Sequence, residues 1–274
     1  MKRRRITFTL RDDIVRQMDR LVDGLTLRSR SQVLEYLLSR VLSDFKPRTV
    51  LILAGGRKRE LEAVTRDTPR CMLKIKGKPI LQHIIERLQS FNISNYIIYV
   101  DYLGEQIRDY FGDGSKFGIK IEYLNGGEPR GTIYPLNLVR KMVTDSFLVV
   151  YGDTISSLDI LDILEHHRKN QSLATVALTS VSNPKDYGVL KIDGNRITSF
   201  REKPSDKIES YLVSAGVFVF EPRIFNYLSK GMKSIEKDLF PKLVEKGVLS
   251  GYPFQGIWLN INAPKDLKRA MLMV

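Results

Sequence analysis

Residues 5–10 alternate between polar and apolar side chains. Every second position in residues 6–10 carries isoleucine, phenylalanine or leucine, and this period of two places those side chains on one face of a β-strand. Arg5, Thr7 and Thr9 fall on the opposite face. The pattern predicts a strand over residues 3–10 with one apolar face and one face that can form hydrogen bonds with a partner.

Two helical patterns follow the predicted strand. Apolar side chains recur every three or four residues between Asp12 and Gly24, and again after Ser29. Ser29 followed by Gln32 matches a capping box, which predicts the start of the second helix. A single strand and two short helices bury little surface, and a lone strand leaves its backbone groups unpaired. We therefore expect a second copy of the chain to pair with this unit, as a homodimer or a higher even oligomer.

From residue 48 onward the pattern changes to alternating strands and helices. Apolar runs predict strands over residues 50–53, 96–100, 119–123, 147–151 and 174–180, and amphipathic runs predict helices over residues 79–90, 104–111, 136–143 and 160–170. This order is typical of an α/β domain with a mainly parallel sheet between two layers of helices, which binds ligands at the carboxyl ends of its strands. We therefore expect two domains, over residues 1–46 and 49–274.

Charge and composition narrow the function classes. The 274 residues include 44 lysines and arginines against 31 acidic residues, a net charge of +13. This balance favours nucleic acid or a phosphate-bearing ligand as a partner, although a merely basic enzyme has the same composition. Cys71 is the single cysteine, which excludes an internal disulfide framework and a four-thiolate zinc site. With neither a long apolar run nor a secretory signal, a cytoplasmic, nucleoid-associated protein without membrane contact is expected.

Residues 2–45 resemble the ribbon-helix-helix family of DNA-binding proteins, in which two chains pair their strands into a ribbon. The resemblance implies that the ribbon enters the major groove of double-stranded DNA and that a phosphate binds at the N-terminus of the second helix. The residues expected to contact DNA are Arg3, Arg5, Thr7, Thr9, Ser29, Arg30 and Ser31. The alternative is a small helical dimerisation arm with a basic tail, in which an arginine on the outward face of the strand has no role.

The second domain carries a series of motifs in order along the chain. They read L-A-G-G-R-K-R-E-L from Leu53, T-P-R-C-M-L from Thr68, G-K-P-I-L from Gly77, E-P-R-G-T from Glu128, Y-G-D ending at Asp153, D-Y-G from Asp186, F-R-E-K-P from Phe200 and W-L-N-I-N-A-P-K-D from Trp258. The series resembles the sugar-1-phosphate nucleotidyltransferases and implies their Rossmann-like three-layer α/β fold. It also implies a nucleotide and phosphate site at Ala54, Gly55, Gly56, Arg57, Lys58, Arg59, Arg70, Gly131 and Thr132, a sugar-phosphate site at Gly188, Glu202 and Lys203, and a metal ligand at Asp153.

Four positions depart from this family pattern in chemical type. Lys58 stands where the family has glycine and Glu60 where it has arginine; a carboxylate about 4 Å from a phosphate charge repels it by about 1–4 kcal/mol. Tyr134 replaces a small residue of the base pocket, and Asn260 replaces the second aspartate that holds Mg²⁺. We therefore expect no efficient transfer and assign no catalytic residue, and Mg²⁺ is expected only where nucleotidyl transfer is retained.

These observations lead to three hypotheses from different classes. The main one is a sequence-specific DNA-binding protein, a transcriptional regulator, whose degenerate nucleotidyltransferase-like domain senses a nucleotide sugar or sugar phosphate or mediates oligomerisation. The alternative is an active sugar-1-phosphate nucleotidyltransferase with a DNA-binding arm, which releases pyrophosphate. The third is a structural assembly protein that binds neither DNA nor such a ligand. Pyrophosphate release separates the second hypothesis from the other two.

Overall fold

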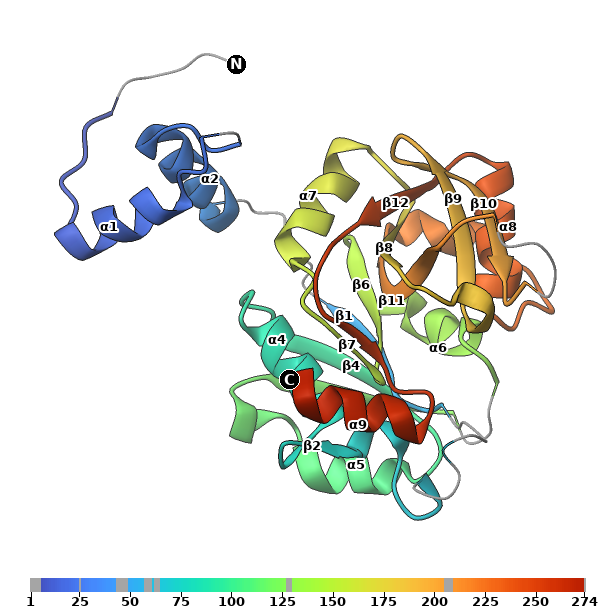
Figure 1. The fold of residues 1–274 in the computed structure, drawn as a ribbon. Coiled ribbons are helices and arrows are strands. Elements are labelled where there is room, and N and C mark those ends of the chain that lie inside the picture. Colours follow the sequence, from blue (N-terminus) through green and yellow to red (C-terminus); the bar gives the residue numbers. More distant parts are fainter. Residues whose placement is uncertain are drawn as a thin grey trace. The chain divides into compact units, whose positions relative to one another are not determined.

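The computed structural model describes residues 6–24, 26–42, 49–56, 61, 65–126, 130–204 and 209–273. The chain divides into two compact units, Met1–Phe45 and Lys46–Val274 (Figure 1). Each unit has its own elements and is described by itself.

The N-terminal unit contains two helices, α1 (Asp12–Leu21) and α2 (Arg30–Leu42). Acidic residues in the first turn of α1 favour its start, because they face the positive end of the helix dipole. The Ser29 hydroxyl accepts a hydrogen bond from the Gln32 backbone N–H at 3.3 Å, which confirms that Ser29 caps α2. Met18 and Val33 are buried between the helices. An exposed ion pair between Arg30 and Asp19 at 2.6 Å also joins them.

The strand predicted at the N-terminus does not form in the single chain. Residues 6–11 have no regular secondary structure, and the side chains of Ile6 and Phe8 are 64% and 53% exposed. The prediction of a strand is wrong for one chain taken alone, because extended backbone without a neighbouring strand has nothing to pair with. Thr7 and Thr9 are exposed, while Arg3 and Arg5 lie outside the described residues.

The second unit is built on a nine-stranded sheet. Its strands are β1 (Val50–Leu53), β4 (Asn95–Val100), β5 (Lys120–Asn125), β6 (Phe147–Tyr151), β8 (Ala174–Ser180), β9 (Gly188–Asp193), β10 (Arg196–Glu202), β11 (Leu212–Phe220) and β12 (Leu249–Pro253), in the spatial order β5-β4-β1-β6-β11-β8-β12-β10-β9. The five strands predicted from apolar runs are confirmed. The sheet is mixed rather than mainly parallel, because β11 runs antiparallel to both of its main neighbours, β6 and β8.

Two short ribbons and six longer helices complete this unit within the described residues. The ribbons pair β2 (Lys74–Ile75) with β3 (Lys78–Pro79) and β7 (Thr154–Ser156) with β13 (Trp258–Asn260). The α-helices are α4 (Ile80–Gln89), α5 (Gly104–Phe111), α6 (Ile133–Leu138), α7 (Ile160–Lys169), α8 (Phe240–Glu245) and α9 (Pro264–Met273). Other helical turns are η2 (Arg70–Met72), η3 (Ser115–Phe117), η4 (Val139–Lys141), η5 (Pro184–Asp186), η6 (Pro222–Tyr227) and η7 (Ile235–Leu239). The helix predicted over residues 136–143 is thus α6 followed by η4.

Strand β8 shows how the layers are stacked. Val176 and Leu178 join the main apolar cluster together with side chains of α6 and α8. Thr175, which directly precedes Val176 and so lies on the alternate face, hydrogen-bonds to His167 of α7 at 2.7 Å. Because successive side chains of a strand point to opposite faces, α7 covers one face of the sheet, and α6 and α8 cover the other. The expected three-layer arrangement is therefore confirmed (Figure 1).

The sheet topology brings separate motifs to one edge. Strands β1 and β6 are parallel neighbours, with Leu53 opposite Tyr151. The loop 54–56 follows β1 and the turn at Asp153 follows β6, so both lie at the carboxyl ends where α/β sheets bind ligands. Among the described residues, none of the helices combines the length and the apolar character needed to span a bilayer.

Candidate functional site

The loop after β1 passes closely between other parts of the site. A side chain on Gly55 would begin 2.6 Å from the Cβ of Asp101, and one on Gly56 would begin 3.1 Å from Nη2 of Arg70. Glycine is therefore required at Gly55, where the backbone approaches β4. Arg57, Lys58 and Arg59, predicted to continue this phosphate loop, lie outside the described residues, as does Glu60.

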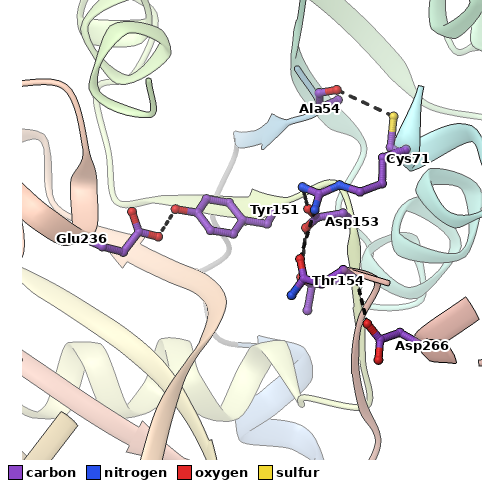
Figure 2. A network of polar contacts seen from close by, with 9 residues as sticks. Ala54, Cys71, Tyr151, Asp153, Thr154, Glu236 and Asp266 are labelled. Atoms are coloured by element: carbon purple, nitrogen blue, oxygen red, sulfur yellow. Dashed lines mark hydrogen bonds and ion pairs between the residues drawn. The ribbon is translucent and has the colours of Figure 1, made fainter. Parts of the chain in front are cut away.

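Cys71 packs against this loop at Ala54 and is not a nucleophile. Its thiol is buried and lies 3.8 Å from the carbonyl oxygen of Ala54, to which it donates (Figure 2). Burial raises the pKa of the Cys71 thiol to about 12. Because the thiolate is the reactive form of cysteine, this side chain is inert at neutral pH and serves packing.

Asp153 is buried beside Arg70. The two form an ion pair, and their side chains are only 10% and 12% exposed. The Thr154 hydroxyl donates to Oδ1 of Asp153 at 3.1 Å, and Nη1 of Arg70 donates to Oδ1 of Asn262 at 3.2 Å. The structure therefore brings together two predicted residues from separate motifs, the metal ligand Asp153 and the phosphate contact Arg70.

Asn260 lies next to this pair because β13 pairs with β7, which places Asn260 opposite Thr154. Its Oδ1 is buried and has no hydrogen-bond partner. The resemblance places a second magnesium-binding carboxylate here, and an amide oxygen is a neutral and weaker ligand for a hard cation. Within the described part of the chain, no group of three acidic, histidine or cysteine side chains could hold a metal ion. The residues present thus do not fit a two-carboxylate Mg²⁺ site.

The predicted sugar-phosphate residues meet at the start of β9 and the end of β10. Gly188 pairs with Glu202 across these strands, and a side chain on Gly188 would begin 2.8 Å from Oε2 of Glu202. Lys203 follows with a left-handed backbone, φ 48°, and its N–H donates to the carbonyl of Tyr187 at 3.0 Å. A left-handed lysine is uncommon, and such residues concentrate at functional sites.

A pocket of about 190 Å³ connects these two groups of residues. Arg70, Asp153, Gly188, Glu202 and Lys203 all line it. The ion pair of Arg70 and Asp153, the half-buried Glu202 and the exposed Lys203 therefore line one cavity, although their motifs are far apart in the sequence.

Sequence reasoning missed two further residues of this pocket, Tyr151 and Glu236. The Tyr151 hydroxyl points toward Glu236 and donates a hydrogen bond to its carboxylate (Figure 2). Burial is the main reason that the pKa of Glu236 is raised, and it also raises the pKa of Tyr151. Glu236 lies in η7 within an ordinary-looking run, I-E-K-D-L, and no spacing in the sequence separates this acid from the neighbouring Asp238.

Gly131 and Thr132 are positioned against the segment that carries Glu236. The Thr132 hydroxyl accepts a hydrogen bond from the Ile235 N–H at 2.8 Å, and the Lys233 carbonyl accepts one from the Ile133 N–H at 3.0 Å. These contacts fix the start of α6, the segment that the resemblance assigns to the base pocket.

Aromatic side chains occupy the next part of that segment. The ring of Tyr134 meets the ring of Tyr99 edge-on at 6.3 Å. The guanidinium of Arg130 lies over the same Tyr134 ring, 4.8 Å from its centroid. Tyr134, in contact with the ring of Tyr99 and the guanidinium of Arg130, therefore stands where the family pattern has a small residue.

The comparisons with known proteins agree with this geometry. Residues 49–274 match the nucleotidyl transferase family. The mannose-1-phosphate guanylyltransferase catalytic subunit beta of Danio rerio is 34% identical over 229 residues, which cover 81% of this chain and 63% of that protein. A mannose-1-phosphate guanylyltransferase of Mycobacterium tuberculosis is 31% identical over 224 residues, 80% of this chain and 62% of that protein.

A solved structure shows the same fold. HddC from Yersinia pseudotuberculosis, complexed with GMP-PN, has a TM-score of 0.71 and 26% identity, covering 82% of this chain and 98% of that one. The chain spans less than two thirds of the length of the two guanylyltransferases. These matches concern the second unit, and the ribbon-helix-helix prediction for residues 2–45 receives no support from them. Through residues 49–274, the chain belongs to the nucleotidyl transferase family.

Proposed function

We propose that residues 49–274 bind a sugar 1-phosphate and a nucleoside triphosphate and join them into a nucleotide sugar. The observation that carries the proposal is the pocket in which Glu202 and Lys203 face Arg70 and Asp153. The names of the guanylyltransferase relatives support mannose 1-phosphate and GTP as the first substrates to test. This proposal favours the enzyme reading over the regulatory one.

The side chains of the pocket suit the two halves of a sugar phosphate. The Glu202 carboxylate can accept hydrogen bonds from sugar hydroxyls, since an ionised carboxylate is an acceptor only. The ammonium of Lys203 supplies a positive charge for the sugar phosphate, and the Arg70 guanidinium can contact two phosphate oxygens at once. Together they hold the attacking phosphate near the loop after β1. They accelerate the reaction because they bring the reactants together and supply fixed positive charge.

The reaction is a phosphoryl-group substitution. An oxygen of the sugar phosphate attacks the α-phosphorus of the nucleoside triphosphate and forms a new P–O bond. The bond between that phosphorus and the α–β bridging oxygen breaks, and pyrophosphate leaves with the electron pair. Arg70 stands beside this position and steadies the negative charge of the phosphates.

Pyrophosphate release tests this proposal directly. The full chain is incubated with mannose 1-phosphate, GTP and Mg²⁺, and pyrophosphate is followed over time, with the other nucleoside triphosphates and glucose 1-phosphate in parallel. Lys203→Ala is expected to reduce kcat/KM by about 10- to 100-fold, the loss of one charge-assisted contact. The exposed Lys246 provides the control variant Lys246→Ala, which should match the wild type. Absence of pyrophosphate with every pair would contradict nucleotidyl transfer and leave ligand sensing without turnover.

We propose DNA binding as a second function, carried by residues 1–46. The observation that favours it is the exposed alternating segment 6–10, which precedes α1 in the same unit as α2, the helix capped by Ser29. Two such segments, one from each of two chains, can pair through their backbone groups and bury their apolar faces. Thr7 and Thr9, with Arg5, then face outward toward base edges. A regulatory role in transcription rests on this pairing.

Electrophoretic mobility shifts on a duplex selected from random sequence test the DNA proposal. The triple variant Arg5→Ala, Thr7→Ala and Thr9→Ala is expected to lose selective binding, at about 1–3 kcal/mol for each base contact removed. The matched control replaces the exposed Lys116, Lys120 and Lys141 of the second unit with alanine. Equal selectivity in the triple variant and the wild type would overturn the assignment of these three residues.

A further inference from the structure

We propose that Arg70 replaces the divalent cation at Asp153, so that phosphate-bearing ligands bind this pocket without Mg²⁺. The inference rests on the proposed function for the class of ligand, a sugar phosphate or nucleotide. It goes beyond the proposed function by naming the positive charge that neutralises the phosphate in this pocket.

The first support is the position of the Arg70 guanidinium. It forms the ion pair with Asp153 inside the pocket, where both side chains are nearly buried. Its Nη1 donates to Oδ1 of Asn262 at 3.2 Å, and its Nη2 is the nearest atom to Gly56, at 3.1 Å from the point where a side chain there would begin. The guanidinium thus lies between the loop after β1 and the acid after β6, which is where a bridging cation is needed.

The second support is the loss of the other carboxylate. Asn260 carries no charge, so only one of the two positions that hold Mg²⁺ in the family pattern is a carboxylate here, and that carboxylate, Asp153, already pairs with Arg70. A divalent ion added beside the guanidinium meets a like charge in a poorly hydrated place, which is unfavourable. Arginine stays charged at any pH that the protein tolerates, so the positive charge at this position is permanent.

The third support is the side chain of Asn260 itself. Its Oδ1 is buried without a hydrogen-bond partner, and Asn260 is one of the residues that line the same pocket. A buried acceptor without a partner is costly unless a ligand supplies the donor. A sugar hydroxyl is such a donor, so Asn260 suits a hydroxyl contact in place of a metal contact.

Isothermal titration with and without the cation tests the inference. Mannose 1-phosphate and GTP are titrated separately into the full chain in Mg²⁺ and in EDTA. We expect Kd to agree in the two conditions for the wild type, and Arg70→Ala to weaken binding about 10- to 100-fold in both. The exposed Arg168 gives the control Arg168→Ala, which should bind like the wild type. Wild-type binding that disappears in EDTA overturns the inference and leaves the proposed function standing.

Electron paramagnetic resonance with Mn²⁺ gives a readout that does not depend on either ligand. The wild type is expected to leave Mn²⁺ free, while the double variant Arg70→Ala, Asn260→Asp acquires a bound ion. Asn226→Asp, at an exposed asparagine, controls for the added charge. Stoichiometric Mn²⁺ in the wild type that is lost in Asp153→Asn contradicts the inference. If neither mannose 1-phosphate nor GTP binds in any condition, the proposed function is wrong. The Mn²⁺ measurement then tests by itself whether Arg70 takes the place of a divalent cation at Asp153.

Discussion

At the residue scale, the site depends on side chains that cannot be exchanged without moving a neighbour. Gly188 shows this most clearly, because the ring of Phe200 and the carboxylate of Glu202 both lie within 3 Å of the position where its Cβ would be. Glu202 is therefore held against bare backbone. This contact explains in physical terms why a glycine stands in the D-Y-G motif.

Gly188→Ala is expected to displace the Glu202 carboxylate and to weaken binding of mannose 1-phosphate. The overpacking should also lower the free energy of unfolding by about 1–3 kcal/mol. Urea unfolding and calorimetric titration measure the two effects. Gly194, on the turn of the same hairpin, has a positive φ and no neighbour within 4 Å, so Gly194→Asn serves as the control. Unchanged sugar-phosphate affinity in Gly188→Ala would contradict the role given to Glu202.

Glu236 makes the stability of the fold depend on pH. Burial raises the pKa of Glu236 above its ordinary value of 4.5, so the folded chain holds this proton more tightly than the unfolded chain. The resulting stabilisation is complete below the unfolded pKa and is lost as the pH rises through the folded pKa. In Glu236→Gln this loss is absent, and the free energy of unfolding should fall less than in the wild type as the pH rises above 4.5.

Urea unfolding over a pH series checks this prediction. The exposed Glu245 gives the control Glu245→Gln, whose pH profile should run parallel to that of the wild type. A Glu236→Gln profile that also runs parallel would show that the buried acid does not titrate as described.

At the scale of elements, apolar runs were sufficient to predict five of the nine strands of the sheet, but not their directions. Strand β8 was predicted within its observed bounds because all of its residues except the last are buried. The central position of β11, antiparallel between β6 and β8, depends on pairings between distant segments, and no local pattern encodes them. For the same reason Glu236 was missed: its segment is held at the pocket by hydrogen bonds to the distant residues Thr132 and Ile133.

The cap of α2 is a local signal that the structure confirms, and it gives a prediction at this scale. Ser29→Ala removes the acceptor for the Gln32 N–H and should destabilise the N-terminal unit by about 1 kcal/mol. Hydrogen exchange of the amides in α1 and α2 of the full chain measures this. Ser31→Ala, at the second residue of α2, is the control. Equal exchange rates in both variants would mean that the cap does not stabilise the N-terminal unit.

At the scale of the whole molecule, the chain carries a net charge of +13 and an N-terminal segment that a single copy leaves exposed. Ile6, Phe8 and Leu10 are all exposed, which is costly for alternating apolar side chains unless a second chain covers them. The motifs of the second unit could be identified from sequence because their residue types are specific. The strand predicted for the first unit has no such support, since residues 6–11 have no regular secondary structure in the single chain.

Phe8→Asp is expected to convert an even oligomer into single chains. The added charge opposes burial of the apolar face. Sedimentation equilibrium of the full chain measures the mass, and Leu272→Asp provides the control because Leu272 is an 86% exposed apolar residue of the other unit. A wild-type protein that sediments as single chains would remove the basis for the paired strands.

The proposed function requires Glu202 and Lys203 to form the binding site for a sugar 1-phosphate. Calorimetric titration of mannose 1-phosphate and of glucose 1-phosphate into the wild type, Glu202→Gln and Lys203→Ala measures this binding. We expect saturable binding of at least one sugar phosphate by the wild type and a loss of about tenfold or more in each variant. Wild-type binding that neither substitution weakens, or no binding of either sugar phosphate, would contradict it.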